Sequence, residues 1–346
     1  MNFRPWGVVL AGGDGTRLKA VSRLVSGDNR PKQFCTLFGT RSLLARTRGR
    51  LTPAISPDRM IFAVVKDHEP FYRPELADVE ESRIVVQPAN RGTTAAIIYS
   101  LLRLNRLEKE PLVAFFPADH HFEDEMQFAR AVDAAFRVVH RHPQSLVLLG
   151  ARAEKADVEY GWIEPGRRVD PAEDGRNSSD SRSVSPSVFR VNRFWEKPSP
   201  DVAQGLLNRG CLWNTFVLAG WARTFLEIIE SISPEALESF HPVARSMLRD
   251  EETERAARLY EALPTGDFSR DILTRCPERL AVLRMDGAGW TDLGTPEGVL
   301  GALQRSAPAP PATPGAFNSW FAAYRSRLEE VCRSAPHEPV SAEQRR

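Results

Sequence analysis

The sequence predicts an α/β fold: a three-layer, mostly parallel sheet covered by helices. Two observations support this fold class. Short apolar runs recur along the first 151 residues, and segments with helical periodicity separate them. Uninterrupted apolar runs of this length are typical of strands buried on both faces. Strands that alternate with helices favour parallel pairing, because each helix carries the chain back across the sheet.

The first five predicted strands are, in order, residues 6–11, 59–65, 83–88, 112–119 and 145–151. The helices between them are predicted at residues 42–51, 93–107 and 127–141. In the last of these helices apolar residues recur at helical spacing and form one apolar face. Ligands of such sheets bind at the carboxyl ends of strands. The segments expected on one edge are therefore residues 12–16, 87–94 and 118–121.

The second half of the chain is less regular. Two strands are expected on either side of a polar, Ser- and Asp-rich stretch at 170–187, which predicts a mobile loop. The other expected elements are strands at 160–166 and 188–198, a mainly helical region at 223–262, and strand and turn at 281–294. We expect one domain over 1–303, in which residues of about 152–280 form a distinct part. A Pro-rich linker (304–315), an amphipathic helix (316–333) and a disordered tail (334–346) would follow.

Composition excludes several classes of protein. The net charge of +1 provides no basic excess for nucleic acid or an anionic membrane. The four cysteines show no CxxC spacing, so neither a zinc site nor a disulfide framework is expected. No run approaches the ~20 apolar residues of a membrane span, and the N-terminal apolar run is too short for a signal peptide. We therefore expect a cytoplasmic protein without nucleic-acid or membrane partners, and 316–333 could pack on the domain or on a second copy in a homodimer.

The most informative stretch is VVLAGGDGTRL, residues 8–18, where an apolar run ends in three glycines within four positions. It does not match the P-loop, because no Gly-Lys pair follows at the required spacing. It does not match the dinucleotide fingerprint either, because Leu18 stands where the third glycine belongs. A tight turn and another kind of phosphate cradle remain open. Arg17 directly behind the glycines, and Lys32 in RPKQF, favour the cradle.

Together, LAGGDGTRL and RPKQF resemble the signature of the sugar-1-phosphate nucleotidyltransferases, and the spelling PKQF is most like that of mannose-1-phosphate guanylyltransferases. The similarity continues in the family's order through QPANRGTTAAI, FFPADHHF, YGWIEPG, FWEKP, CLWNTF and GWTDLG, and it spans about residues 1–300. The resemblance implies a Rossmann-like sheet with an inserted sugar-binding subregion and a C-terminal helix. It also implies that the phosphate of a sugar 1-phosphate attacks the α-phosphorus of a nucleoside triphosphate and releases pyrophosphate.

The resemblance also assigns roles to residues on the nucleotide side. The nucleotide-binding residues would be Leu10, Ala11, Gly12, Gly13, Gly15, Thr16, Gln87, Gly92 and Thr93. Arg17 would hold the β- and γ-phosphates, and Lys32 would bridge the α-phosphate and the sugar phosphate. Asp119 and Asp292 resemble the two carboxylates that bind Mg²⁺. Neither histidine that follows Asp119 is expected to be a metal ligand.

On the sugar side, the resemblance assigns Gly161, Glu196, Lys197 and Asn214 to the sugar phosphate. The implied substrates are GTP and mannose 1-phosphate, with Mg²⁺ as cofactor. Two alternatives stay open: an enzyme for another pair of nucleoside triphosphate and sugar phosphate, and a non-catalytic protein that binds a sugar nucleotide. The segment DFSRDIL, residues 267–273, departs from the family pattern, and no site residue is assigned in it.

Overall fold

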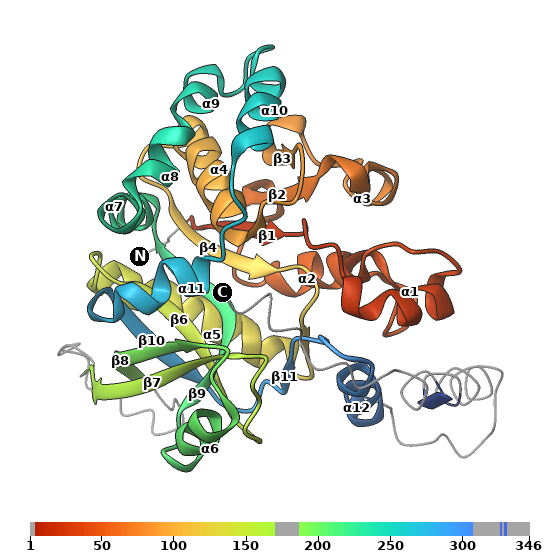
Figure 1. Cartoon of the computed structure of the whole chain (residues 1–346), viewed down its shortest axis with the longest axis vertical. Helices are drawn as coiled ribbons and strands as arrows, with labels where there is room; N and C mark the ends of the chain where they lie inside the picture. The colour runs from red at the N-terminus through yellow and green to blue at the C-terminus, as the bar shows by residue number, and fades with distance from the viewer. Residues whose placement is uncertain (1–3, 170–186, 307–325, 327–328, 331–346) are drawn as a thin grey trace.

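The computed structural model describes residues 4–169, 187–306, 326, 329 and 330. Its centre is one nine-stranded sheet in the order β3-β2-β1-β4-β9-β6-β10-β8-β7 (Figure 1). The strands are β1 (Trp6–Leu10), β2 (Met60–Val65), β3 (Ile84–Gln87), β4 (Leu112–Pro117), β6 (Leu146–Arg152), β7 (Gly161–Arg168), β8 (Val188–Glu196), β9 (Leu212–Trp221) and β10 (Leu280–Met285). Among these strands, β8 and β9 alone run against the others. The predicted α/β fold with a central, mostly parallel sheet is confirmed.

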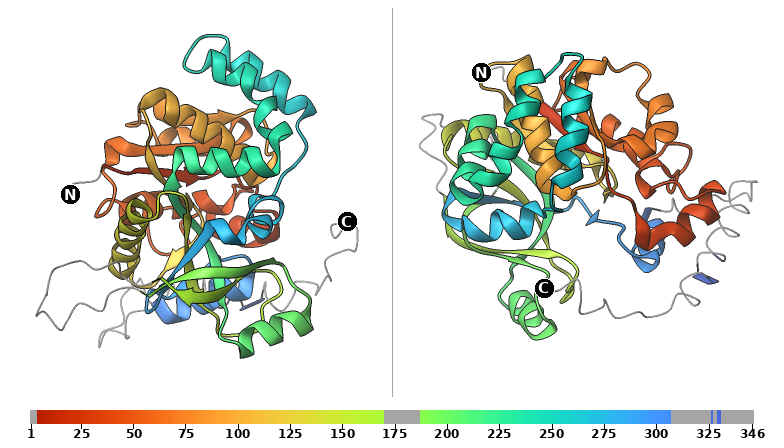
Figure 2. Two further views of the ribbon diagram at one scale, coloured as in Figure 1. Left: turned by 90° about the vertical axis from the view of Figure 1, so that its left-hand side faces the viewer. Right: turned by 45° about the horizontal axis from the view of Figure 1, so that its top comes forward.

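Helices cover both faces of this sheet, as Figures 1 and 2 show. Alternate residues of β1 enter different cores: Val9 packs with α2 and α5, whereas Val8 packs with α4, α7 and α10. This alternation is what a strand buried on both faces requires. The longer helices are α1 (Lys19–Ser26), α2 (Leu43–Leu51), α4 (Gly92–Leu107), α5 (Glu125–Arg141), α6 (Pro200–Asn208), α7 (Ala222–Ile232), α10 (Glu252–Ala262) and α12 (Pro296–Ser306). The shorter ones are α3 (Glu69–Glu75), α8 (Pro234–Ser239), α9 (His241–Ser246) and α11 (Phe268–Asp271).

Strand β9 is the main element of the sheet that the sequence does not predict. It lies between β4 and β6 and is antiparallel to both. Its close packing depends on glycine: a Cβ on Gly150 of β6 would lie 2.7 Å from the Leu212 side chain. Residues 211–216 belong to a motif of the sequence, but no strand is predicted there.

A short two-stranded ribbon brings together residues of the functional site. Strand β5 (His121–Phe122) follows β4 directly and pairs with β11 (Trp290–Thr291). Because β5 comes just after Asp119 and β11 just before Asp292, this pairing brings the two aspartates to the same place. No helix in the described ranges is long and apolar enough to span a membrane. The predicted loop, apart from Ser187, and nearly all of the predicted linker, C-terminal helix and tail lie outside the described residues.

Candidate active site

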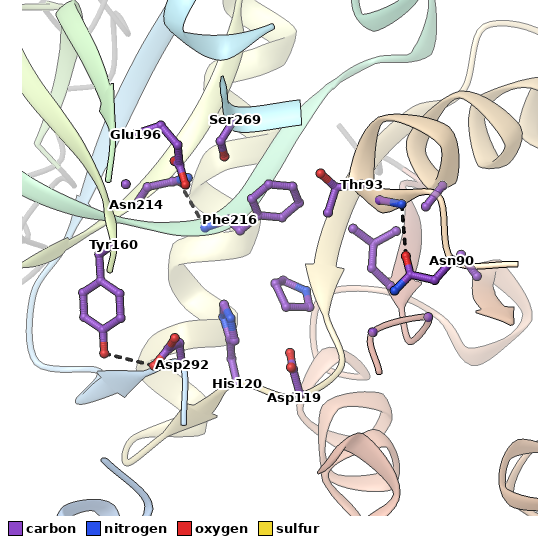
Figure 3. A pocket seen from close by; sticks show the side chains of 18 of the residues that line it. Asn90, Thr93, Asp119, His120, Tyr160, Glu196, Asn214, Phe216, Ser269 and Asp292 are labelled. Atoms are coloured by element: carbon purple, nitrogen blue, oxygen red, sulfur yellow. Dashed lines mark hydrogen bonds between the residues drawn. The ribbon is translucent and has the colours of Figure 1, made fainter. Parts of the chain in front are cut away.

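A pocket of about 400 Å³ lies at the carboxyl ends of β1, β3 and β4 and extends to β7, β8 and β9 (Figure 3). Residues from all three segments expected on one edge of the sheet line it. The sequence-predicted residues on its wall are Leu10, Gly12, Gly13, Gln87, Gly92, Thr93, Asp119, Gly161, Glu196, Asn214 and Asp292. Ala11, Gly15, Thr16, Arg17, Lys32 and Lys197 are not on this wall.

The glycine loop leaves β1 with its backbone amides free. Gln33 donates through Nε2 to the carbonyls of Ala11 and Gly13, at 2.9 and 2.8 Å, and so fixes the loop. Among the described residues nothing accepts a hydrogen bond from the N–H groups of residues 12 to 15. A Cβ on Gly13 would meet no atom within 4 Å, whereas Gly15, at a φ of +60°, lies against the backbone of Lys32. Free amides that face a pocket are the usual cradle for an anion.

Arg17 lies beside the main pocket rather than on its wall. It belongs to the short 3₁₀ turn Thr16–Leu18 and lines an adjoining cavity of about 240 Å³. Its Nη1 pairs with Oε2 of Glu159 at 3.1 Å. Glu159 lines both cavities, so this ion pair stands where the two meet. The guanidinium that is predicted to bind phosphates is therefore already paired with a carboxylate.

Lys32 is buried behind the pocket. Its Nζ lies 3.0 Å from Oδ2 of Asp119 and donates to the carbonyls of Asp292 and Leu293, at 2.7 and 3.2 Å. An ammonium group has three donors, so all three are engaged. Burial is the largest single influence on Asp119 and disfavours its charged form, but Lys32, together with smaller contributions from His120 and from hydrogen bonds, holds the pKa of that carboxyl below its usual range. Lys32 thereby ties one predicted metal ligand to the turn that carries the other.

The carboxylate of Asp292 is held by hydrogen bonds of its own. Its Oδ1 accepts from the Tyr160 hydroxyl at 3.0 Å and from the Gly294 backbone N–H at 2.8 Å (Figure 3). Burial and the adjacent Asp292 raise the pKa of Tyr160, so this hydroxyl stays protonated as a donor. His120 lies between the two aspartates, and burial lowers its pKa to about 4. Asp292 Oδ2 accepts no hydrogen bond from the part of the chain that is described.

The two aspartates suit a magnesium ion better than a metal held by protein groups alone. No cluster of three or more His, Cys, Asp or Glu side chains able to hold a metal occurs among the described residues. Mg²⁺ usually keeps several waters and binds through one or two carboxylates together with phosphate oxygens. Asp119 and Asp292, which line one pocket beside free backbone amides, match that donor set.

Polar groups from three strands form the other side of the pocket. A Cβ on Gly161 would lie 2.8 Å from Oε2 of Glu196 and 3.3 Å from Cβ of Asn214, so a larger residue at this position would displace the Glu196 carboxylate. Asn214 accepts a hydrogen bond from the Phe216 backbone N–H at 3.1 Å. Burial, and next the charge of Asp267, raise the pKa of Glu196 to about 7. Lys197 follows at a φ of +47° with an exposed side chain.

The segment around α11 contributes a pocket residue that the sequence does not predict. The Gly266 carbonyl accepts from the Thr94 N–H, and the Phe268 N–H donates to the Thr93 hydroxyl at 2.8 Å. These contacts place Ser269, only 3% exposed, on the pocket wall. Its hydroxyl makes no hydrogen bond with any described residue. No motif marks Ser269, whereas Tyr160 and Trp290, also on the wall, lie within quoted motifs.

On the side of β3, the predicted residue Gln87 is buried with its amide already engaged. Its Oε1 accepts from the Tyr260 hydroxyl at 3.2 Å, and its Nε2 lies 3.4 Å from the Val64 carbonyl. Asn90 is more accessible and donates to Oδ2 of Asp14 in the glycine loop at 3.0 Å. The loop after β3 is therefore joined to the glycine loop across the pocket.

Comparison with known proteins places the chain in a family. The sequence profile of the family described as nucleotidyl transferase matches residues 6–307. Xanthan biosynthesis protein XanB of Xanthomonas campestris is 27% identical over 292 residues, which is 83% of this chain and 57% of that protein. Mannose-1-phosphate guanylyltransferase ManC of Salmonella typhimurium is 28% identical over 294 residues, with the same two shares. The chain thus spans little more than half the length of these curated relatives.

Solved structures agree with this placement. A protein from Thermus thermophilus described as mannose-1-phosphate geranyltransferase matches with a TM-score of 0.69 and 25% identity, over 84% of this chain and 77% of that one. A protein from Bacillus anthracis described as a glucose-1-phosphate thymidylyltransferase matches with a TM-score of 0.54 and 15% identity. The match covers 90% of this chain and 98% of that one. The second likeness shows the fold alone.

Proposed function

Because the chain belongs to the nucleotidyl transferase family, we propose that it transfers a nucleotidyl group from GTP to mannose 1-phosphate, forming GDP-mannose and pyrophosphate. The observation that carries this proposal is the two-sided pocket. One side has the free amides of the glycine loop, the other has the polar groups around Glu196, and the two aspartates lie between them. The relatives named for mannose 1-phosphate favour that sugar.

The reaction needs two anions held in line, with their charge neutralised. A sugar-phosphate oxygen attacks the α-phosphorus, and the bond from that phosphorus to the β-phosphate oxygen breaks. We assign the triphosphate to the backbone amides of residues 12 to 15, and the leaving pyrophosphate to Arg17. Phosphate would replace Glu159 on Arg17, because both are anions that fit a guanidinium.

Lys32 has a double role in this proposal. In the absence of substrate it neutralises Asp119, which lines the pocket, and we assign its ammonium to the phosphates that bind beside that carboxylate. Asp119 and Asp292 would hold Mg²⁺, which when bound neutralises charge on the phosphate oxygens.

The sugar side would bind hydroxyl groups. We assign them to Glu196, Asn214 and the backbone of Gly161. We add the Ser269 hydroxyl because it is buried, faces the pocket and makes no hydrogen bond within the described ranges. Lys197 would reach the sugar phosphate only after a movement of its exposed side chain. A cytoplasmic location is consistent with the three described cysteines, which are buried and free.

A second candidate is the same reaction with another nucleoside triphosphate. This candidate is supported by Gln87, whose side-chain amide is already bonded to Tyr260 and close to the Val64 carbonyl. Recognition of the base would then depend on backbone groups and on Asn90. Pyrophosphate release should be measured with each of the four nucleoside triphosphates against several sugar 1-phosphates. We expect GTP with mannose 1-phosphate to give the highest kcat/KM. A higher value for another pair would replace the substrates, and loss of pyrophosphate release in Asp119→Asn would still support the site.

A further inference from the structure

His120 lies on the pocket wall between the two aspartates, and a neighbouring residue of the same wall fixes the orientation of its ring. The indole Nε1 of Trp290 lies 3.1 Å from Nδ1 of His120, and the two rings meet edge to face with centroids 5.5 Å apart. The backbone of His120 is also fixed, because Arg50 donates to its carbonyl at 2.9 Å. Trp290 in turn is held by the pairing of β11 with β5.

This contact determines which ring nitrogen carries the proton. An indole N–H can only donate, so Nδ1 must offer its lone pair. An imidazole that accepts at Nδ1 is neutral and carries its hydrogen on Nε2. Within the described chain no group makes a hydrogen bond with Nε2, although a carboxylate lies on each side of the ring (Figure 3). The Nε2–H of His120 is therefore an uncharged donor on the pocket wall that no described residue accepts from.

We propose that the Nε2–H of His120 donates a hydrogen bond to a phosphate oxygen of the bound substrates, and that Trp290 is the positioning residue that keeps the hydrogen on Nε2. The inference rests on the proposed function, which brings phosphate oxygens to the space between Asp119 and Asp292. A neutral donor suits this place, because it can bind a phosphate oxygen without repelling a cation held by the same two carboxylates.

The proposal separates two replacements of His120. The amide nitrogen of glutamine can reach the place of Nε2, whereas that of asparagine reaches only the place of Nδ1. We expect His120→Gln to keep kcat/KM within about threefold of the wild type. His120→Asn should lose about 10- to 100-fold, which corresponds to one hydrogen bond to a charged group. Equal losses in the two variants would overturn the proposal.

The role of Trp290 is tested by removing only its N–H function. Trp290→Phe should lower kcat/KM about 3- to 10-fold in the wild type but not further in His120→Gln, whose amide donor has no tautomers. Trp213→Phe is the matched control, because Trp213 packs against Trp290 while its own Nε1 is buried and finds no hydrogen-bond partner among the described residues. An equal effect of Trp290→Phe in both backgrounds, or of Trp213→Phe, would reduce Trp290 to a packing role.

A spectrum of the resting protein tests the tautomer without any turnover. In protein labelled with ¹⁵N-histidine, long-range ¹H–¹⁵N correlations should show the hydrogen of His120 on Nε2, and Trp290→Phe should give a mixture of tautomers. Adding inorganic phosphate should shift the Nε2 proton in the wild type. A hydrogen on Nδ1, or no shift with phosphate, would contradict the inference even if the protein proves inactive, whereas inactivity by itself would count only against the proposed function.

Discussion

Replacement of Lys32 by methionine should destabilise the protein by roughly 2–3 kcal/mol at neutral pH, because it leaves a carboxylate without its partner. The ammonium has a carboxylate and two carbonyls within 3.2 Å, and its side chain is 10% exposed. A hydrogen bond to a charged group contributes about 1.5–3 kcal/mol. Breaking a fully buried ion pair costs about 3–5 kcal/mol, but the Asp119 side chain is 28% exposed, so water recovers part of that cost.

The pH dependence has a definite sign. In the wild type the pKa of Asp119 lies below its ordinary value of 3.8, so its contribution to stability is present above that value and is lost as the pH falls through the folded pKa. In Lys32→Met the main influence that opposes burial is gone, so the same pKa shifts upward and the variant gains less stability than the wild type as the pH rises. The gap between the two proteins should therefore be widest near neutral pH and should narrow toward acid.

Urea denaturation at several pH values between about 3.5 and 7 measures this gap. Lys19→Met is the control, because the Lys19 side chain is exposed and makes no hydrogen bond or ion pair with the described residues. Adding Asp119→Asn to Lys32→Met should restore much of the stability at pH 7, since the uncompensated charge is then removed. Equal stabilities of Lys32→Met and Lys19→Met at neutral pH, or a gap that does not change with pH, would refute the reasoning.

Three further predictions concern the pocket. Glu159→Gln should tighten the binding of pyrophosphate by up to about fivefold in calorimetry, because an exposed ion pair contributes about 1 kcal/mol at most; a similar gain in an Arg17→Ala background would show that the pair with Arg17 is not the cause. Glu196 has a pKa of about 7 in the folded protein against 4.5 ordinarily. Its protonation therefore stabilises the fold in full below pH 4.5, and this contribution is lost as the pH rises from 4.5 through 7. In urea titrations Glu196→Gln should therefore gain up to about 3 kcal/mol on the wild type between pH 4 and 8, and a constant difference would contradict the raised pKa. Ser269→Ala should raise KM for the sugar phosphate several-fold and leave KM for GTP unchanged in steady-state kinetics, and the reverse pattern would move Ser269 to the nucleotide side.

Much of the fold could be predicted from apolar runs alone, because β1, β2 and β4 are buried on both faces and contain almost no polar residues. The position of β9 could not. Its sequence, LWNTFVLAGW, mixes polar with apolar residues, and its place between β4 and β6 is set by pairing with strands far away in the chain. Local patterns carry no information about such partners.

The site shows the same division. The glycine loop and the two aspartates stand out in the sequence, but the ribbon that joins them, β5 with β11, has only two residues in each strand and no recognisable pattern. The pattern around Lys32 indicates a cation near phosphate, yet its burial against Asp119 depends on the turn after β11. Ser269 reaches the pocket only because Gly266 pairs with the start of α4.

The most direct test of the proposed function is ³¹P NMR of the purified protein with GTP, mannose 1-phosphate and Mg²⁺. We expect the two phosphorus signals of GDP-mannose to grow together with that of pyrophosphate, and neither to appear with Asp292→Asn. Signals of inorganic phosphate and GDP without GDP-mannose, or equal product formation by Asp292→Asn, would contradict nucleotidyl transfer at this pocket.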